Sequence, residues 1–422
     1  MGANRSDGEK RAVRRSLHPT VKATGFVSFF TDMGSEIIYP ILGVFATGGL
    51  GLSREMFGLI EGLAEGFPRI VGLFSGAISD RVKNRKWVIF LGYSISTAMK
   101  PLIGFAAAGW QLLTFRVLDR LGKGIRGTPR DALVADCTDP DMRGHAFGYQ
   151  RAMDNAGALA GGLIAFVLLR LLGFSMKQAI IVSIVPGVLA VATILLFIRE
   201  KPDRKIVGQS GLVNPFSGLR AMPREFFVYV GATSIFAVAN SSDAFLLLRS
   251  HQTFTSHLHD VQKSVPLLCL LWALLHFVKS LTSLWGGKLS DRVGRLPVLV
   301  IGWALYSVVY LGFAFMESFW APWVLFALYG VFYGMTEGAS RAAIADIVPE
   351  GRRGAAFGFW SIVEGILLIV ASVLTGWLWD VTGKAEAALL LCGALSLVAT
   401  LYLAVWALMG GLKRKGPLEA KA

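Results

Sequence analysis

Asp32 and Glu36 lie one helical turn apart within the otherwise apolar and aromatic stretch "FFTDMGSEIIYPI" (29–41). Side chains four residues apart share one face of a helix. Removal from water and a neighbouring negative charge both favour the protonated form of a carboxyl group. Two carboxyl groups placed in this way can take up and release a proton near neutral pH, so the stretch predicts a proton-binding position.

The composition indicates where such a stretch lies. Of the 422 residues, 54% are hydrophobic and only 17% are charged, whereas soluble domains contain about 25% charged residues. The sequence therefore predicts a polytopic membrane protein. Its three cysteines, Cys137, Cys269 and Cys392, are too scattered for a disulfide framework or a zinc site. We expect no metal site and no other cofactor.

A helix needs about 20 mostly apolar residues to cross the hydrocarbon layer of a bilayer. Twelve stretches meet this requirement, so we predict an all-α protein with twelve transmembrane helices. They cover residues 23–46, 56–79, 87–108, 111–135, 147–170, 179–198, 226–248, 264–287, 296–316, 320–345, 356–378 and 386–410.

Lys and Arg are concentrated on one side of these helices. The basic segments include the N-terminal tail, "RVKNRK" (81–86), the stretch 199–224 and "KRK" (413–415). Because basic loops favour the cytoplasm, we predict a bacterial inner-membrane protein with both termini in the cytoplasm. The net charge of +14 then faces the cytoplasm and the anionic headgroups of the lipid bilayer. No nucleic-acid partner is needed to explain it.

Two segments of the first half recur in the second half. "GAISDRV" (76–82) returns as "GKLSDRV" (287–293), and "ADCTDPDMRGHAFG" (135–148) returns as "ADIVPEGRRGAAFG" (345–358). The shared offset of 210 or 211 residues is half the chain length and predicts two parallel six-helix repeats. We expect the following division: a tail (1–22), a first bundle (23–198), a linker (199–225), a second bundle (226–411) and a tail (412–422).

These features resemble the major facilitator superfamily over essentially the whole chain. Its signature between helices 2 and 3 reads "GAISDRVKNRK" and "GKLSDRVGR" here, with Lys83 in place of the second Gly of the first copy. Its helix 4 signature is an Arg that is followed three and four residues later by Gln and Gly. This sequence resembles it with Arg120, Lys123 and Gly124, where Lys stands in place of Gln. The resemblance implies a monomeric transporter in which helices 1, 4, 7 and 10 line a central path and helices 2, 5, 8 and 11 complete it.

The repeated Asp-Arg pairs predict a role in gating. A carboxylate at a helix end can cap the neighbouring helix and pair with Arg, which holds two helices in one arrangement. The alternative is the ordinary polarity of a cytoplasmic loop. The gating candidates are Gly76, Asp80, Arg81, Arg120, Gly124, Asp291, Arg292, Gly294 and Arg295.

The predicted helices contain anions and cations in similar numbers. Each costs about 2.5–3.5 kcal/mol at a helix centre, so they must pair or line a hydrated passage. Glu61, Glu65 and Arg69 share one helix face and can pair along it, and Glu337 and Arg341 repeat that spacing. Carboxylates near mid-membrane depth are the proton-coupling candidates: Asp32, Glu36, Glu65, Asp154, Asp243 and Glu364.

Asp243 repeats Asp32 at an offset of 211, and Glu364 repeats Asp154 at an offset of 210. The alternative role for Asp32 is a structural ion pair with Arg126, Arg130 or Lys100. So many charges favour a small polar or charged substrate, since Arg side chains bind carboxylate or phosphate groups and acids bind amines or metals. The substrate-cavity candidates are Arg126, Arg130, Lys100, Glu337, Arg341 and Asn240.

The segment "HQTFTSHLHD" (251–260) raises the alternative of a metal site, but its spacing matches no standard ligand motif. We interpret it as a solvated loop. The chain has no phosphate-binding loop of the Gly-Lys-Ser/Thr type in a suitable context, which argues against transport driven by ATP.

The function class predicted is a proton-coupled secondary transporter that works by alternating access and has no enzyme activity. Antiporters of the superfamily carry a Gly-rich run with a Pro on helix 5, which is partly present here as Gly148, Gly157 and Gly161, with Gly162 in place of the Pro. This pattern favours efflux by antiport. The alternatives are uptake by symport, for example of an organic anion or a metal chelate, and a membrane sensor or enzyme.

Overall fold

The computed structural model describes residues 17–82, 84–139, 142–199 and 219–410, without the side chains of Ala77, Asp80 and Glu350. Within these residues the regular structure is helical, with no strand. The helices are α1 (Pro19–Val44), α2 (Arg54–Arg81), α3 (Arg85–Phe105), α4 (Gly109–Asp136), α5 (Arg143–Phe166), α6 (Met176–Val182), α7 (Ile184–Phe197), α8 (Arg224–Ala239), α9 (Ala244–Leu258), α10 (Val261–Val293), α11 (Arg295–Phe315), α12 (Ala321–Ile347), α13 (Arg353–Thr382) and α14 (Ala385–Leu408).

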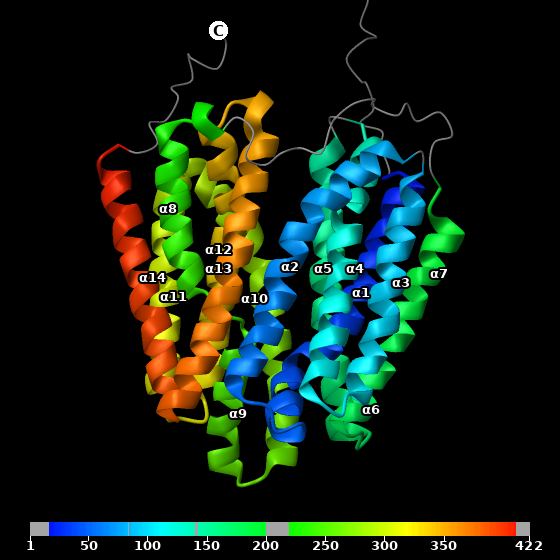
Figure 1. The fold of residues 1–422 in the computed structure, drawn as a ribbon, viewed down its shortest axis with the longest axis vertical. Coiled ribbons are helices and arrows are strands. Elements are labelled where there is room, and N and C mark those ends of the chain that lie inside the picture. Colours follow the sequence, from blue (N-terminus) through cyan, green and yellow to red (C-terminus); the bar gives the residue numbers. More distant parts are fainter. Residues whose placement is uncertain (1–16, 83, 140–141, 200–218, 411–422) are drawn as a thin grey trace, which may run out of the picture.

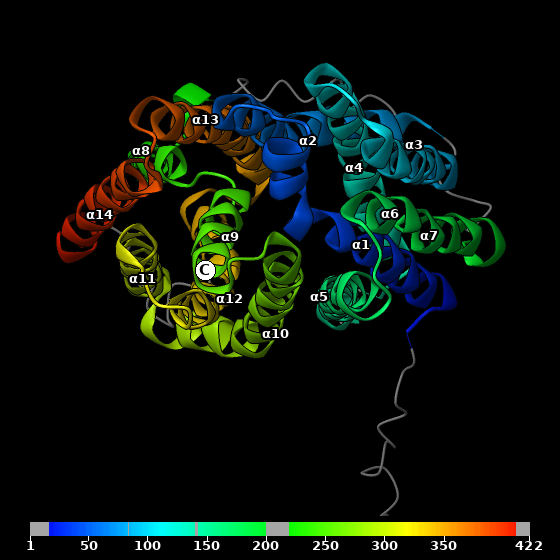
Figure 2. The same ribbon diagram turned by 90° about the horizontal axis from the view of Figure 1, so that it is seen from below.

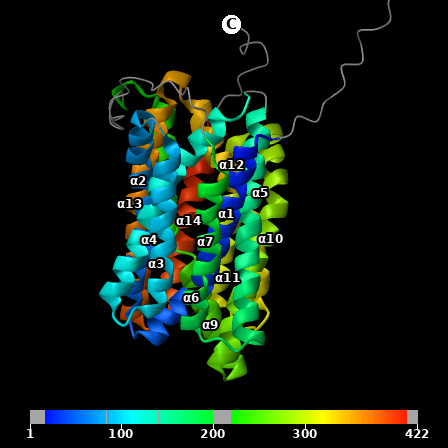
Figure 3. The same ribbon diagram turned by 90° about the vertical axis from the view of Figure 1, so that its right-hand side faces the viewer.

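These elements make twelve spans, which confirms the predicted fold class. The π-helical turns η1 (Phe45–Gly49) and η3 (Val167–Leu171) continue α1 and α5. Helices α6 and α7 form one span that is interrupted at Ser183, and α8 and α9 form another that is interrupted between Asn240 and Asp243. Figures 1 and 3 show all of them running in roughly one direction through the molecule.

The two halves of the chain form two helix bundles that lie side by side (Figure 2). Helices α1 to α7 make the first bundle and α8 to α14 the second. The main contacts between the bundles are those of α2 with α13 and of α5 with α10, and α1 also contacts α9 and α10. The repeated halves that the sequence predicts are therefore present.

Eight spans are long and apolar enough to cross a membrane by length and composition. The described helices that fall outside this set are α1, α2, α4 and α12, because these carry most of the charges inside the bundles. They nevertheless pack among the apolar spans. A charged helix is stable in this position only if its charges pair or meet water rather than lipid.

Some helix ends differ from the predicted ones. The spans predicted at 226–248 and 264–287 reach Leu258 and Val293 in the structure. Polar residues at these ends still form helix because hydrogen bonding along the backbone does not require an apolar environment. The proposed tails and linker fall largely outside the described residues, so the predicted boundaries of the five segments stay predictions.

Helix α1 begins on the side of the molecule where α14 ends (Figure 1). We call this the terminal side, and the opposite side the distal side. The connection between α9 and α10 lies on the distal side, together with those between α11 and α12 and between α13 and α14.

Candidate functional site

A buried ion cluster joins α2 to α4. Arg116 donates from Nε to Glu61 Oε1 at 2.8 Å and from Nη2 to Glu61 Oε2 at 3.0 Å. Arg116 also lies 3.6 Å from Asp119, which accepts a short hydrogen bond from Ser96. Both Glu61 and Arg116 are almost completely buried. A buried ion pair of this kind requires a two-point geometry, because only then is the cost of removing both ions from water offset.

The cluster is one end of a charged stripe along α4. Arg116, Asp119, Arg120, Lys123 and Arg126 follow each other at intervals that place them on neighbouring turns. Lys123, at the midpoint of the helix, is exposed, and in the described part of the chain it makes no hydrogen bond or ion pair. An exposed ammonium group at this depth requires a hydrated passage, since lipid would not tolerate it.

Asp32 and Glu65 differ from the other carboxylates in the first bundle. Neither makes a hydrogen bond, or an ion pair within 4 Å, with any residue that the structure describes. Both are partly buried, on α1 and α2 respectively. A carboxylate in this condition must be protonated, hydrated or bound to a cation from outside the protein.

The alternative role for Asp32, a structural ion pair, is not the arrangement found. Lys100 donates to the backbone carbonyl of Thr31 at 3.1 Å. Arg126 lies over the ring of Tyr93, with its Cζ atom 4.2 Å from the ring centre, and one of its Nη atoms is buried without a hydrogen bond. Arg130 donates to Ser28 at 2.8 Å and pairs with Asp131. Each of the three cations is thus directed at a group other than Asp32.

Glu36 connects the two bundles. Its Oε2 accepts a hydrogen bond of 2.7 Å from the indole N–H of Trp272 on α10. The Trp272 ring lies 4.6 Å from that of Tyr39, one turn further along α1, and the Tyr39 hydroxyl is 3.2 Å from that of Ser242. Glu36 is therefore part of a contact between the bundles, whereas Asp32, one turn toward the terminal side, is not.

The interruption between α8 and α9 places Asp243 opposite two tyrosines of α12. Asp243 accepts hydrogen bonds from Tyr329 at 2.6 Å and from Tyr333 at 2.8 Å. Asn240 ends α8 with φ −90° and ψ 74°, outside the helical region. Asp243 is the repeat partner of Asp32, so in the described chain equivalent carboxylates have two donors in one bundle and none in the other.

Backbone groups freed by this interruption find partners on neighbouring helices. Tyr306 donates to the carbonyl of Ala239 at 2.9 Å, Tyr310 lies 3.4 Å from the carbonyl of Ser241, and Ser372 accepts from the Ser242 N–H at 3.1 Å. Irregular backbone is stable at membrane depth only when protein or water satisfies its polar groups. Hydroxyl groups of α11 and α13 do so here.

Ion pairs also cross between the bundles. Arg69 on α2 pairs with Glu364 on α13 at 2.6 Å. Glu337 on α12 accepts from Arg151 of the other bundle and from Lys279 of its own bundle, both at 2.9 Å. The charges therefore meet across helices.

These pairs differ from the pairing along single helix faces that the sequence spacing permits. Arg116 pairs with Glu61, and Arg69 pairs with Glu364 rather than with Glu61 or Glu65. Among the described residues, Glu337 pairs with Arg151 and Lys279 and not with Arg341. The physical reason is that a pair at i and i+4 contributes only about 0.3–0.5 kcal/mol. Partners on neighbouring helices offer two-point or more buried geometry.

The remaining candidates lie apart from these pairs. Asp154 on α5 is 3.7 Å from Arg130, and its Oδ1 is buried without a hydrogen bond. Arg341 is exposed and makes no hydrogen bond or ion pair within the described chain. Asn240 is partly buried beside the helix interruption.

The gating candidates lie mostly at the terminal side. The side chain of Asp80 lies outside the described residues. In the second copy, Asp291 pairs with Arg295 at 2.5 Å, and Arg295 also reaches Asp346 at the end of α12 at 3.1 Å. The equivalent pair in the first copy is Arg85 with Asp136 at 2.6 Å. Arg292 has interactions of its own.

The glycines and Arg120 of this set have packing roles. A methyl group on Gly76 would lie 2.8 Å from Thr128, and one on Gly124 would lie 2.8 Å from Val71. Gly294 has φ +103°, a conformation that favours glycine, between α10 and α11. Arg120 is buried and lies 3.8 Å from Asp119. Arg81 is exposed at the end of α2.

Sequence reasoning did not select Arg116 or Trp272, although both contact central carboxylates. Arg116 was a visible signal, because an Arg in an apolar helix must have a buried partner. No comparable signal marks Trp272, since a Trp in a membrane helix usually packs or lies at an interface. Among the described residues, no group of three or more His, Cys, Asp or Glu side chains is arranged to hold a metal ion.

Two repeated six-helix bundles with ion pairs across their interface define a polytopic membrane protein built like a transporter. The family model of the Major Facilitator Superfamily matches residues 24–278 and 262–422. The chain belongs to this superfamily.

Individual relatives agree with this assignment. The chain is 35% identical over 373 residues to the uncharacterized MFS-type transporter MJ1317 of Methanocaldococcus jannaschii, which covers 87% of this chain and 90% of the relative. It is 24% identical over 395 residues to a hexuronate transporter of Bacillus subtilis, covering 89% and 90% of the two chains. The fold is also similar to a crystal structure of the nucleoside transporter NupG, with a TM-score of 0.71 and 14% sequence identity. The match covers 94% of this chain and 100% of the NupG chain.

Proposed function

We propose that this protein is a proton-coupled antiporter that exports a small polar solute bearing a positive charge. The observation that carries this proposal is that Asp32 and Glu65 have no hydrogen-bond or ion-pair partner in the described chain, in a bundle whose other buried carboxylates are mostly paired. A site that lacks a partner within the protein is available to a proton or to a substrate cation.

Competition explains how such a site couples two fluxes. A carboxylate that holds a proton cannot also pair with the cationic group of a solute. Binding of either ligand therefore requires release of the other, and each ligand shifts the populations of the two access states by its difference in affinity. Exchange of protons for solute follows from this competition.

The proposed orientation has the terminal side in the cytoplasm. The basic residues of the sequence are concentrated in the segments of that side, and basic loops favour the cytoplasm. Proton entry from the outside would then drive solute out of a bacterial cell through the inner membrane. We expect the working unit to be a monomer.

Reconstituted liposomes with an imposed pH gradient test this proposal. A panel of cationic, anionic and neutral solutes is added, and proton movement is followed with a pH-sensitive dye. With wild-type protein, a cationic solute is expected to cause protons to move across the membrane in the direction opposite to the solute. The double variant Asp32→Asn with Glu65→Gln is expected to abolish this proton movement. Glu317→Gln, which changes an exposed carboxylate of the distal side, serves as the control.

Full coupling in the variant that lacks both carboxylates would contradict the proposal. So would proton movement in the same direction as the solute, which defines symport. Symport of an organic anion is the second candidate, and it is supported by Lys123 and Arg341, two exposed cations without a partner in the described residues. The likeness to a hexuronate transporter points the same way.

A further inference from the structure

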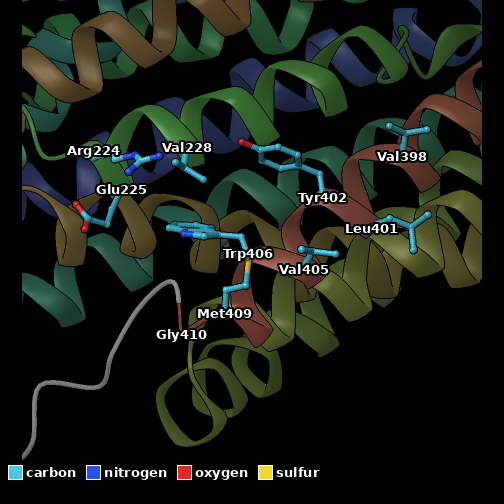
Figure 4. A pocket seen from close by; sticks show the side chains of 10 residues that line it. All are labelled: Arg224, Glu225, Val228, Val398, Leu401, Tyr402, Val405, Trp406, Met409 and Gly410. Carbon is cyan, nitrogen blue, oxygen red and sulfur yellow. The ribbon is translucent and has the colours of Figure 1, made fainter.

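A groove runs along the outer surface of the second bundle between α8 and α14 (Figure 4). It has a volume of about 760 Å³. It lies where α8 begins and α14 ends, which places it on the terminal side. The groove is lined by none of the candidate transport residues, and Asp32 and Glu65 lie in the other bundle.

The groove is lined by apolar, aromatic and charged side chains. Val398, Leu401 and Val405 of α14 line one part and are exposed. Tyr402, between Leu401 and Val405, and Trp406, nearer the helix end, also line it. Aromatic side chains of these two kinds are enriched at the level of lipid headgroups. The groove therefore combines an apolar surface with aromatic side chains of the kinds found at headgroup level.

The apolar part of the groove is long enough to hold a segment of an acyl chain. Val398 and Trp406 are eight residues apart, which corresponds to about 12 Å along a helix. Leu401 and Val405, which lie between them, are exposed and apolar, as a surface against bilayer hydrocarbon requires. An acyl chain that lies in the groove would cover this surface without leaving the membrane.

Two opposite charges stand at the polar end. Arg224 and Glu225 open α8 and line the groove together with Trp406. Both are exposed, and neither makes a hydrogen bond or an ion pair with a residue of the described chain. A guanidinium group binds phosphate through two parallel hydrogen bonds. A carboxylate beside it complements an ammonium group.

We propose that this groove binds a phospholipid with a primary amine in its headgroup, of the phosphatidylethanolamine type. Arg224 binds the phosphate, Glu225 accepts from the ammonium group, and the groove holds one acyl chain. An anionic lipid such as phosphatidylglycerol satisfies Arg224 but leaves Glu225 beside a negative charge. Phosphatidylcholine carries no N–H on its quaternary nitrogen and cannot donate to Glu225.

Fluorescence quenching tests the proposal on the full-length protein in detergent. Short-chain lipids with brominated acyl chains are titrated in, and the signal of Trp406 is taken as the difference between wild type and Trp406→Phe. Phosphatidylethanolamine is expected to reach half-saturation at about 10-fold lower concentration than the other two lipids, which is the effect of one charge-assisted hydrogen bond.

Matched variants separate the two charges. Arg224→Gln is expected to weaken binding of all three lipids about 10-fold, whereas Arg220→Gln, an exposed cation outside the groove, leaves binding unchanged. Glu225→Gln is expected to remove the preference for phosphatidylethanolamine over phosphatidylglycerol. Equal half-saturation for the three lipids, or wild-type binding in Arg224→Gln, would overturn the proposal and indicate bulk lipid alone.

Discussion

Glu61 and Arg116 face each other from α2 and α4 through two hydrogen bonds, of 2.8 and 3.0 Å, and water reaches neither side chain. Loss of one partner leaves a buried charge alone, which costs about 3–5 kcal/mol. We therefore expect Arg116→Met to lower the stability of the protein by this amount, measured by thermal unfolding in detergent.

A second variant checks that the unpaired charge is the cause. Glu61→Leu together with Arg116→Met removes both ions and is expected to restore most of the lost stability. Lys263→Gln, which breaks an exposed pair of 3.4 Å on the distal side, is expected to change stability by less than about 1 kcal/mol. Equal losses in the single and double variants of the buried pair would contradict the prediction.

Gly66 allows the close approach of the two bundles. A methyl group at this position would collide with the carbonyl oxygen of Gly365 on α13, a backbone atom that cannot move aside. Gly66→Ala is expected to disfavour the arrangement seen here by about 1–3 kcal/mol, as overpacking does. Spin labels at Phe74 and Ile366 would report this as a population with a longer distance between α2 and α13.

Gly287→Ala provides the comparison for this change. Gly287 lies on α10 with nothing within 4 Å of an added methyl group, so this variant is expected to keep the wild-type distance distribution. An unchanged distribution in Gly66→Ala would show that the contact between α2 and α13 tolerates the extra volume.

Trp272→Phe removes the N–H donor of Glu36 and keeps a ring against Tyr39. The ionised carboxylate loses a charge-assisted hydrogen bond, which contributes about 1.5–3 kcal/mol. The protonated carboxyl group depends less on this donor. The loss of thermal stability is therefore expected to be larger at pH 8 than at pH 5.

Trp379→Phe is the matched control, because the Trp379 indole N–H is buried and has no hydrogen-bond partner among the residues that the structure describes. It loses a similar volume and is expected to show the same loss of stability at both pH values. A pH-independent effect of Trp272→Phe would mean that packing alone accounts for the residue.

Tyr306→Phe is predicted to destabilise the non-helical backbone between α8 and α9. The variant leaves the buried carbonyl of Ala239 without its donor at 2.9 Å, which costs about 1–3 kcal/mol. Thermal unfolding measures the effect, and Tyr93→Phe serves as a control, because its hydroxyl makes no hydrogen bond in the described chain and its ring still lies beneath Arg126. Equal stability of both variants would contradict a supporting role for Tyr306.

Much of the fold could be predicted from the sequence, because hydrophobic length and the repeat of "SDRV" depend only on local pattern. The interruption at Asn240 could not, since its stability comes from Tyr306, Tyr310 and Ser372 on other helices. The pairing of charges could not be predicted from the sequence either. Arg69 shares a face with Glu65 yet reaches Glu364, which lies almost 300 residues further along the chain.

The candidate site, too, could be predicted from the sequence only in part. That carboxylates occur at mid-membrane depth is visible in "FFTDMGSEIIYPI". The sequence does not show which of these carboxylates lack a partner, because Asp32 and Glu36 lie one helical turn apart in the same apolar stretch. Only the position of Trp272 across the interface separates them.

The twofold repeat of the fold does not extend to its chemistry. At an offset of 210 residues, Asp119 and Lys123 of α4 correspond to Tyr329 and Tyr333 of α12. The first bundle therefore has an exposed ammonium group, that of Lys123, where the second bundle has the partly buried phenol of Tyr333. Under the proposed function, a solute with a charged end and a flat, less polar end would then have one favoured orientation between the bundles.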